Sequence, residues 1–242
     1  MAAKTGLPSQ RVVRKFGLSG VQCDECAKAA VILERAHDSA NALLRAFELA
    51  RQERGKPRGI STDDEQDLLR AMLVMAAAGL DSMLKQLIRD AVPVLVGGDD
   101  RVREGLEKFV ARSVRGDSEG DDLGGTMFLA KILTSGNSQT AVIEQYIRSL
   151  TGGSLQSAEE LSRTVAALGL QKVRIDHGTL RPIFQARNRI IHELDINLDG
   201  DRRKRNHRGL EDMRKHAKTL LDVAEQILGE VEQKVSQILQ AG

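Results

Sequence analysis

The stretch STDDEQDLLRAMLVMAAAGLDSMLKQL, residues 61–87, decides the fold class. Its apolar positions recur at alternating intervals of four and three, the period of one helix face; they are Leu69, Leu73, Ala76, Leu80, Met83 and Leu87. Ser61, Thr62 and the acidic residues 63–65 come first. Such residues favour a helix N-terminus because they accept hydrogen bonds from its free amides and complement its dipole. The stretch therefore predicts a long helix, over about 62–92, whose apolar face needs a partner.

The end of the chain offers that partner. The same spacing returns there in Leu210, Met213, Ala217, Leu220, Ala224, Ile227 and Val231. This pattern predicts a final long helix over about 208–239. Two stripes of this kind can cover each other when their helices pack as neighbours in a bundle.

The remaining sequence also favours helices. Aromatic residues make up 2% of the chain, Trp is absent, and alternating β-branched runs are scarce, so little in the chain is typical of strands. Ser157 with Glu160 forms a capping box, and Gly169 marks the end of the helix that follows. We predict an all-α protein, with further helices near 27–54, 100–115, 123–134, 138–150, 157–168 and 179–195.

Glycine and proline suggest where this helical chain divides. The sequence GKPRG at 55–59 interrupts it early. We therefore expect an N-terminal helical extension over 1–58 and a helical domain over 62–240. An acidic, glycine-rich loop is expected at 115–122.

Composition limits the class of protein. With 242 residues and 41% hydrophobic content, the chain can bury one sizeable core, and we expect none of its apolar runs to approach the roughly 18 residues of a membrane span. The N-terminus lacks the apolar stretch of a secretory signal, and two cysteines are too few for a disulfide framework. These features predict a soluble, cytoplasmic protein with no membrane partner. The net charge of +2 is nearly balanced, so any affinity for RNA must come from local clusters.

The sequence RNRIIHE, residues 187–193, places chemically active groups on one predicted helix. An Arg keeps its charge and can stabilise a phosphate that gains charge, while a His near neutrality can take a proton from a ribose 2′-hydroxyl. His192 and Asn188 share the polar face, opposite an apolar stripe of Ile183, Ala186, Ile190 and Leu194. Arg187 lies about 140° around the helix and roughly 7.5 Å along it from His192. Two copies of the helix meeting across a two-fold axis would bring all four groups into one cleft.

The order of these elements resembles the HEPN (higher eukaryotes and prokaryotes nucleotide-binding) ribonucleases, of the RiboL-PSP type. A long helix containing GLDSMLKQLIRD, a variable helical middle, RNRIIHE, a polar loop and a terminal helix carry the resemblance over 62–240. It implies a HEPN-like helical bundle that forms a homodimer. It also implies an endoribonuclease that needs no metal or cofactor and leaves 2′,3′-cyclic phosphate and 5′-hydroxyl ends. Such proteins often act as toxins or in defence against phage, so an antitoxin or a defence-system protein is an expected partner.

The resemblance also implies roles for particular residues. Arg187 and His192 match its Arg-x4-6-His motif, and Asn188 matches the polar position after the Arg. Asp81 corresponds to an acidic residue of the early long helix. Glu193 departs from the pattern, because a small residue is frequent there.

Two further features have both a functional and a structural reading. Arg189 and the run Arg202, Arg203, Lys204 and Arg205 can bind RNA phosphates beside the motif, or the run can be a solvated loop. Cys23 and Cys26 have the spacing of half a zinc site, but tetrahedral zinc needs four ligands. Free thiols, with no metal, are the expectation, and a zinc site shared with His37 or between chains is the alternative.

A second class of function remains open from the sequence. The same Arg, Asn and His patch can belong to a non-catalytic helical module that binds nucleotide, nucleic acid or a protein partner. Cleavage of RNA in EDTA distinguishes the two classes.

Overall fold

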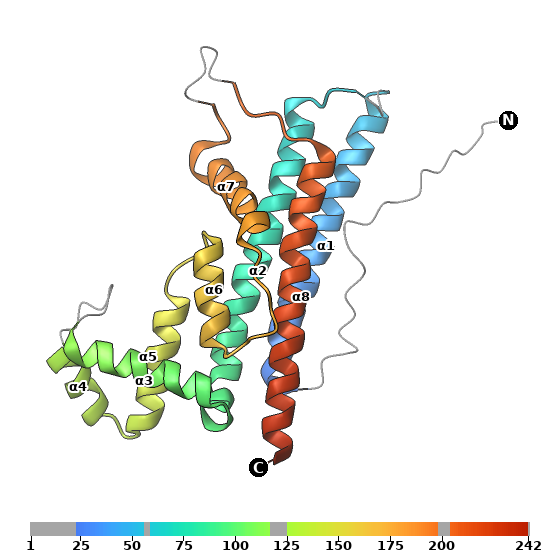
Figure 1. The fold of residues 1–242 in the computed structure, drawn as a ribbon. Helices are drawn as coiled ribbons and strands as arrows, with labels where there is room; N and C mark the ends of the chain where they lie inside the picture. Colours follow the sequence, from blue (N-terminus) through green and yellow to red (C-terminus); the bar gives the residue numbers. More distant parts are fainter. Residues whose placement is uncertain (1–22, 56–58, 117–124, 198–203, 242) are drawn as a thin grey trace.

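The computed structural model describes residues 23–55, 59–116, 125–197 and 204–241. These residues form eight helices (Figure 1). In chain order these are α1 (Asp24–Glu53), α2 (Asp63–Gly98), α3 (Asp100–Arg115), α4 (Gly125–Leu133), α5 (Ser138–Thr151), α6 (Ala158–Ala167), α7 (His177–Glu193) and α8 (Leu210–Ala241). Across these described ranges there is no strand, only one isolated antiparallel bridge between Ile196 and Arg205. The all-α prediction is confirmed. Most helix ends lie within a few residues of their predicted positions.

The three long helices α1, α2 and α8 run side by side and enclose the core (Figure 1). All six residues of the predicted α2 stripe are buried. The α8 stripe is buried too, except for Leu210 at the start of the helix, which is half-buried. The prediction that α2 and α8 pack as neighbours in a bundle is confirmed.

Helix α1 belongs to this core, which differs from the expected separate extension. Leu33, Leu44 and Phe47 are each no more than 1% exposed and lie in the same apolar cluster as α2 and α8. The break near residues 55–59 therefore joins two packed helices. Turn residues indicate where a helix ends, but they carry no information about where the next one packs.

Helices α1 and α2 approach closely at Gly79. A Cβ atom built on Gly79 would lie 2.2 Å from the Cβ of Ala36, well inside van der Waals contact. Ala29 and Ala40 of α1 and Ala76 of α2 are also small and fully buried. Small side chains on both helices let the two backbones come together.

Helices α3, α4 and α5 form a smaller lobe beside the far end of α2 (Figure 1). Its centre is aromatic: the Phe109 ring centroid lies 6.0 Å from that of Phe128 and 5.3 Å from that of Tyr146. Asp99 caps the start of α3 by accepting hydrogen bonds from the amides of Arg101 and Val102.

Two helix starts confirm the capping predicted from sequence. Thr62 and Glu65 form a reciprocal capping box at the start of α2, and Ser157 and Glu160 form one at the start of α6. Gly169 follows α6 with a φ of +68°, as its expected role at the helix end requires.

The length and apolar composition of α2 would also let it cross a membrane. Its most apolar 18-residue window has a mean hydropathy of 1.4, which corrects the expectation that no stretch comes near a membrane span. Within the chain, 56% of that window is buried, because α2 is the central helix of the bundle.

Candidate functional site

Helix α7, which carries the Arg and His motif, is fixed by its cap and its apolar face. Asp176 caps it by accepting hydrogen bonds from the amides of Gly178 and Thr179. One side is buried, through Leu180, Ile183, Phe184 and Ala186. The helix packs mainly on α2 and α6, so its opposite side faces solvent. The motif residues therefore lie on a firmly seated helix, in its last two turns.

The end of α7 differs from the prediction. The helix stops at Glu193, and Leu194 takes a left-handed conformation with a φ of +50°. Leu194 is 65% exposed and does not continue the buried stripe that was expected to include it. Its neighbour Ile191 is also exposed. The end of the motif helix thus presents two apolar side chains to solvent.

Arg187 reaches around α7 to the polar face. Its Nη1 donates a hydrogen bond to Oδ1 of Asn188, at 2.9 Å. Asn188 and His192 are four residues apart and therefore lie on the same side of the helix. The backbone positions of Arg187 and His192 are about 140° apart around the helix. The Arg187 side chain bends toward Asn188, and so its guanidinium lies closer to the side of the helix that carries His192. The three motif residues share one side of the helix end.

His192 is exposed and available. Within the described part of the chain, its imidazole has no hydrogen-bond or ion-pair partner. The Nε of Arg187 is buried and also has no hydrogen-bond partner there. A histidine without a structural partner can exchange protons with a bound substrate.

Asp81 and Asn188 each form a hydrogen bond with the loop that precedes α6. Asp81 accepts a hydrogen bond from the amide of Leu155 at 2.9 Å and pairs with Lys85 at 2.8 Å. Asn188 donates its Nδ2 to the carbonyl oxygen of Gln156 at 3.1 Å. The structure therefore brings Asp81 near the motif through residues 155 and 156. No direct bond from Asp81 to Arg187 or His192 occurs in the described residues.

The predicted basic run divides into different environments. Arg202 and Arg203 lie outside the described residues, while Lys204 and Arg189 are exposed. Arg205 pairs with Asp67 at 2.6 Å and donates its Nε to the carbonyl oxygen of Leu194 at 3.2 Å. The hydrogen bond from Arg205 is the main reason that the pKa of Asp67 lies below its usual value. Arg205 therefore has a structural role that the sequence did not indicate.

Sequence reasoning missed a buried ionic cluster at the end of α7. Asp195 is fully buried, and its carboxylate accepts from Nε of Arg70 at 3.0 Å and from Nε of Arg208 at 2.9 Å. Asn206 adds a third donor at 3.1 Å. Burial opposes the ionisation of Asp195, but hydrogen bonds from Arg208, Arg70 and Asn206 outweigh it, so the pKa of Asp195 lies below its usual value. No local pattern marks these residues, because Arg70 is 125 positions away from Asp195.

The two cysteines lie at the start of α1 as buried free thiols. Burial is the main cause that raises the pKa of both thiols. In the described residues no three His, Cys, Asp or Glu side chains are grouped to hold a metal ion. His37 lies about 16 Å further along α1 from Cys26 and pairs with Glu225 of α8, so the structure does not join it to the cysteines.

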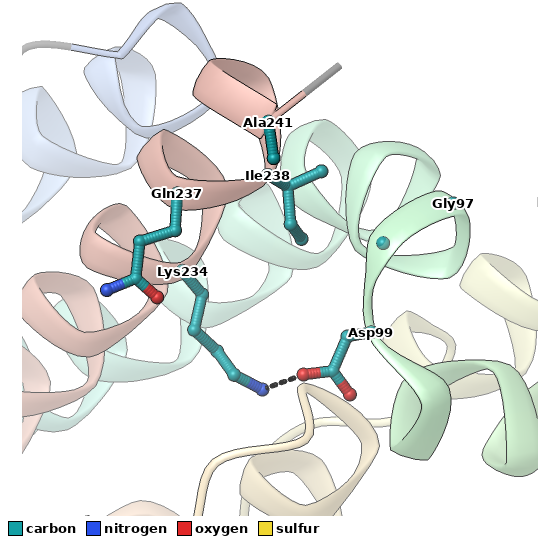
Figure 2. Close-up of a pocket in the computed structure, with 7 residues that line it drawn as sticks. Gly97, Asp99, Lys234, Gln237, Ile238 and Ala241 are labelled. Carbon is teal, nitrogen blue, oxygen red and sulfur yellow. Dashed lines mark ion pairs between the residues drawn. The ribbon is translucent and has the colours of Figure 1, made fainter.

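A surface pocket lies at the other end of the bundle, where α2 ends beside α8 (Figure 2). It is lined by Gly97, Gly98, Asp99, Lys234, Gln237, Ile238 and Ala241. The Lys234 ammonium pairs with Asp99 at 2.5 Å and donates to the carbonyl oxygen of Gly169 at 2.8 Å. Lys234 thus joins α8, the start of α3 and the loop after α6. The pocket is about 40 Å along α2 from Arg70, and so it is separate from the motif residues.

Comparison of the chain with models of known protein families, with curated proteins and with solved structures found no match.

Proposed function

We propose that this protein is a metal-independent endoribonuclease of the HEPN type, with Arg187 and His192 as its catalytic residues. The observation that carries the proposal is the exposed, unpartnered imidazole of His192 beside the hydrogen-bonded pair of Arg187 and Asn188. A general base and a permanent cation on one helix face are two of the groups that RNA cleavage by its own 2′-hydroxyl requires.

The chemistry needs no added reactant. Neutral His192 takes the proton of a ribose 2′-hydroxyl, and the 2′-oxygen attacks the adjacent phosphorus. The bond from phosphorus to the 5′-oxygen breaks, and that oxygen leaves with a proton from a second acid. The products are a 2′,3′-cyclic phosphate and a 5′-hydroxyl. Arg187 binds the non-bridging oxygens as their charge grows, and Asn188 accepts a hydrogen bond from the Arg187 guanidinium.

A second copy of the chain supplies the second acid in this proposal. Each chain offers one His at the motif, and base and acid must act on opposite sides of the phosphorus. Ile191 and Leu194 expose apolar surface around His192, and burying it favours association of two such helix ends. The active species is then a homodimer. Such an RNA-cutting activity suits a toxin or a phage-defence effector that a partner protein holds inactive.

The first test is cleavage of RNA by the purified protein in EDTA. We expect the wild type to cut, and we expect His192→Gln to lower kcat by about 100-fold or more, because a general base contributes at least that much. His177→Gln is the matched control. It removes an imidazole from the same helix, where His177 instead bonds Ser162, and should leave cleavage unchanged.

Two results would oppose this assignment. Full activity of His192→Gln in a folded protein would exclude His192 as the base. A folded wild-type protein that binds RNA but never cuts it would instead support a non-catalytic binding module.

The basic residues after α7 give a separate prediction about binding. Replacing Arg202, Arg203 and Lys204 together with Gln should flatten the salt dependence of RNA binding by up to about 2 units of log-log slope, at about 0.7 per phosphate contact. Arg205→Gln should change the slope little, because Arg205 already pairs with Asp67. Binding measured by fluorescence anisotropy across a salt series checks both. An unchanged slope in the triple variant would assign the run to solvation.

A further inference from the structure

The buried Asp195 carboxylate joins three segments that lie far apart in the sequence. It is shared between Arg70 of α2 and Arg208, which lies just before α8. Arg208 grips it with two donors, Nε to Oδ2 at 2.9 Å and Nη2 to Oδ1 at 2.5 Å. Gln66 locks Arg208 in turn, because the two exchange a pair of hydrogen bonds between side chain and backbone.

This cluster also determines how the motif helix ends. The amide of Asp195 donates to the carbonyl oxygen of Arg189 at 2.9 Å, which closes the last turn of α7 around His192. Asp195 itself has a φ of +59°, a conformation that residues with a Cβ seldom adopt unless their surroundings impose it. The bonds from Arg70 and Arg208 are those surroundings. They bind Asp195, three residues after His192, to Arg70 of α2.

The same cluster holds the backbone at the end of the basic run, around Lys204. The amide of Asn206 donates to the carbonyl oxygen of Asp195 at 2.8 Å, and the amide of Asn197 donates to that of Lys204 at 2.9 Å. The backbone on both sides of residues 198–203 is therefore paired. Nη2 of Arg70 completes the arrangement by donating to the carbonyl oxygen of Asn206 at 2.8 Å.

A buried ionic cluster is an expensive way to hold two helices together. Apolar residues of similar size often stabilise a fold as well or better, because ions lose their hydration on burial. Directional bonds offer something that apolar contacts do not: they fix a backbone in one place. Catalytic groups need such accuracy, since a misplacement of about 1 Å can lower a rate by roughly 100-fold.

We propose that Asp195 is a positioning residue for the motif. Through its bonds to Arg70 and Arg208 it holds the backbone at His192 and at Lys204 in fixed positions relative to each other. This inference rests on the proposed ribonuclease function for its effect on rate. The effect of Asp195 on the position of His192 does not depend on that function.

The test is the isosteric variant Asp195→Asn in the full chain. We expect the NMR ring signals of His192, assigned among the five histidines by their loss in His192→Gln, to shift. We expect amide exchange at residues 195–197 and 206 to speed up. In RNA cleavage, kcat should fall by about 10- to 100-fold while KM changes by less than about threefold, because the substrate contacts themselves remain.

Asp99→Asn is the matched control, because Asp99 is also a paired carboxylate, bound to Lys234 at the far end of the bundle. It should leave the His192 signals and kcat unchanged even if it lowers the melting temperature as much as Asp195→Asn does. If Asp195→Asn does not fold, Arg208→Lys replaces it, because Lys keeps the charge and loses the two-pronged grip. Unmoved His192 signals, or a rate that falls only with the folded fraction, would overturn the proposal. A wild type that does not cut RNA would remove the ribonuclease, and the ring signals would still decide whether Asp195 places His192.

Discussion

Replacing Gly79 with Leu should prevent the native packing of α1 on α2 and cost at least about 3 kcal/mol of the free energy of unfolding, at the upper end of overpacking effects. Even the first added carbon would lie 2.2 Å from the Cβ of Ala36, and 3.5 Å from its Cα. The obstacle is therefore close to the backbone of α1 and cannot turn away as a long side chain would. The helices must separate, and the buried face of α1 then loses contacts along its length.

Gly229→Leu is the matched control on α8. Gly229 is exposed, and a Cβ there would meet nothing within 4 Å. Since Gly is less favourable than Leu inside a helix, this variant should gain about 0.5–1 kcal/mol. Urea unfolding followed by circular dichroism measures both changes. Equal stabilities for the Gly79 variant and the wild type would show that α1 and α2 are not in close contact at this point.

Acid should unfold the protein because three buried or half-buried carboxylates are ionised in the fold. Burial opposes ionisation of Asp195, Glu65 and Asp99, but hydrogen bonds from cationic side chains outweigh it and lower the pKa of each. The donors are Arg208 and Arg70 for Asp195, Arg54 for Glu65 and Lys234 for Asp99. A carboxyl whose pKa is lower in the folded state than in the unfolded state stabilises the fold at pH values above its unfolded pKa, which is near 4. That stability is lost as the pH falls through the folded pKa.

The free energy of unfolding should therefore fall steadily below about pH 4.5, by about 1.4 kcal/mol for each unit by which a folded pKa is lowered. Urea unfolding at a series of pH values between 6 and 2.5 measures it. In Glu65→Gln the curve should be shallower, since one of the three carboxyls no longer titrates. A free energy that stayed level or rose on acidification would contradict the ionised state of this set.

The sequence allowed the helices to be predicted well because their signals are local. The stripe from Leu69 to Leu87 and the capping residues Thr62 and Ser157 act within a few residues of themselves. The pairing of α2 with α8 followed from two matching stripes. The packing of α1 could not be predicted in this way, because the small residues of α1 indicate a close approach only once Gly79 is known to lie opposite Ala36.

The candidate site was predictable in its residues but not in its surroundings. Residues 187–192 are contiguous, so their presence on one helix could be read directly. The link from Asp81 to Asn188 runs through a loop 74 positions away from Asp81. Arg205 was predicted to bind RNA phosphates or to lie in a solvated loop, and in the structure it pairs with Asp67. Such contacts depend on the fold as a whole, and no spacing in the chain announces them.

The most direct measurement of the proposed function is the chemical identity of the RNA ends produced in EDTA. If His192 activates a ribose 2′-hydroxyl, the upstream product carries a 2′,3′-cyclic phosphate and the downstream product a 5′-hydroxyl, and a single 2′-deoxy nucleotide at the cut position blocks cleavage there. Both features should vanish in His192→Gln and persist in His177→Gln. Products with 5′-phosphate ends, or cleavage that ignores the 2′-deoxy substitution, would show that water rather than the 2′-hydroxyl attacks, and would contradict the assignment of Arg187 and His192.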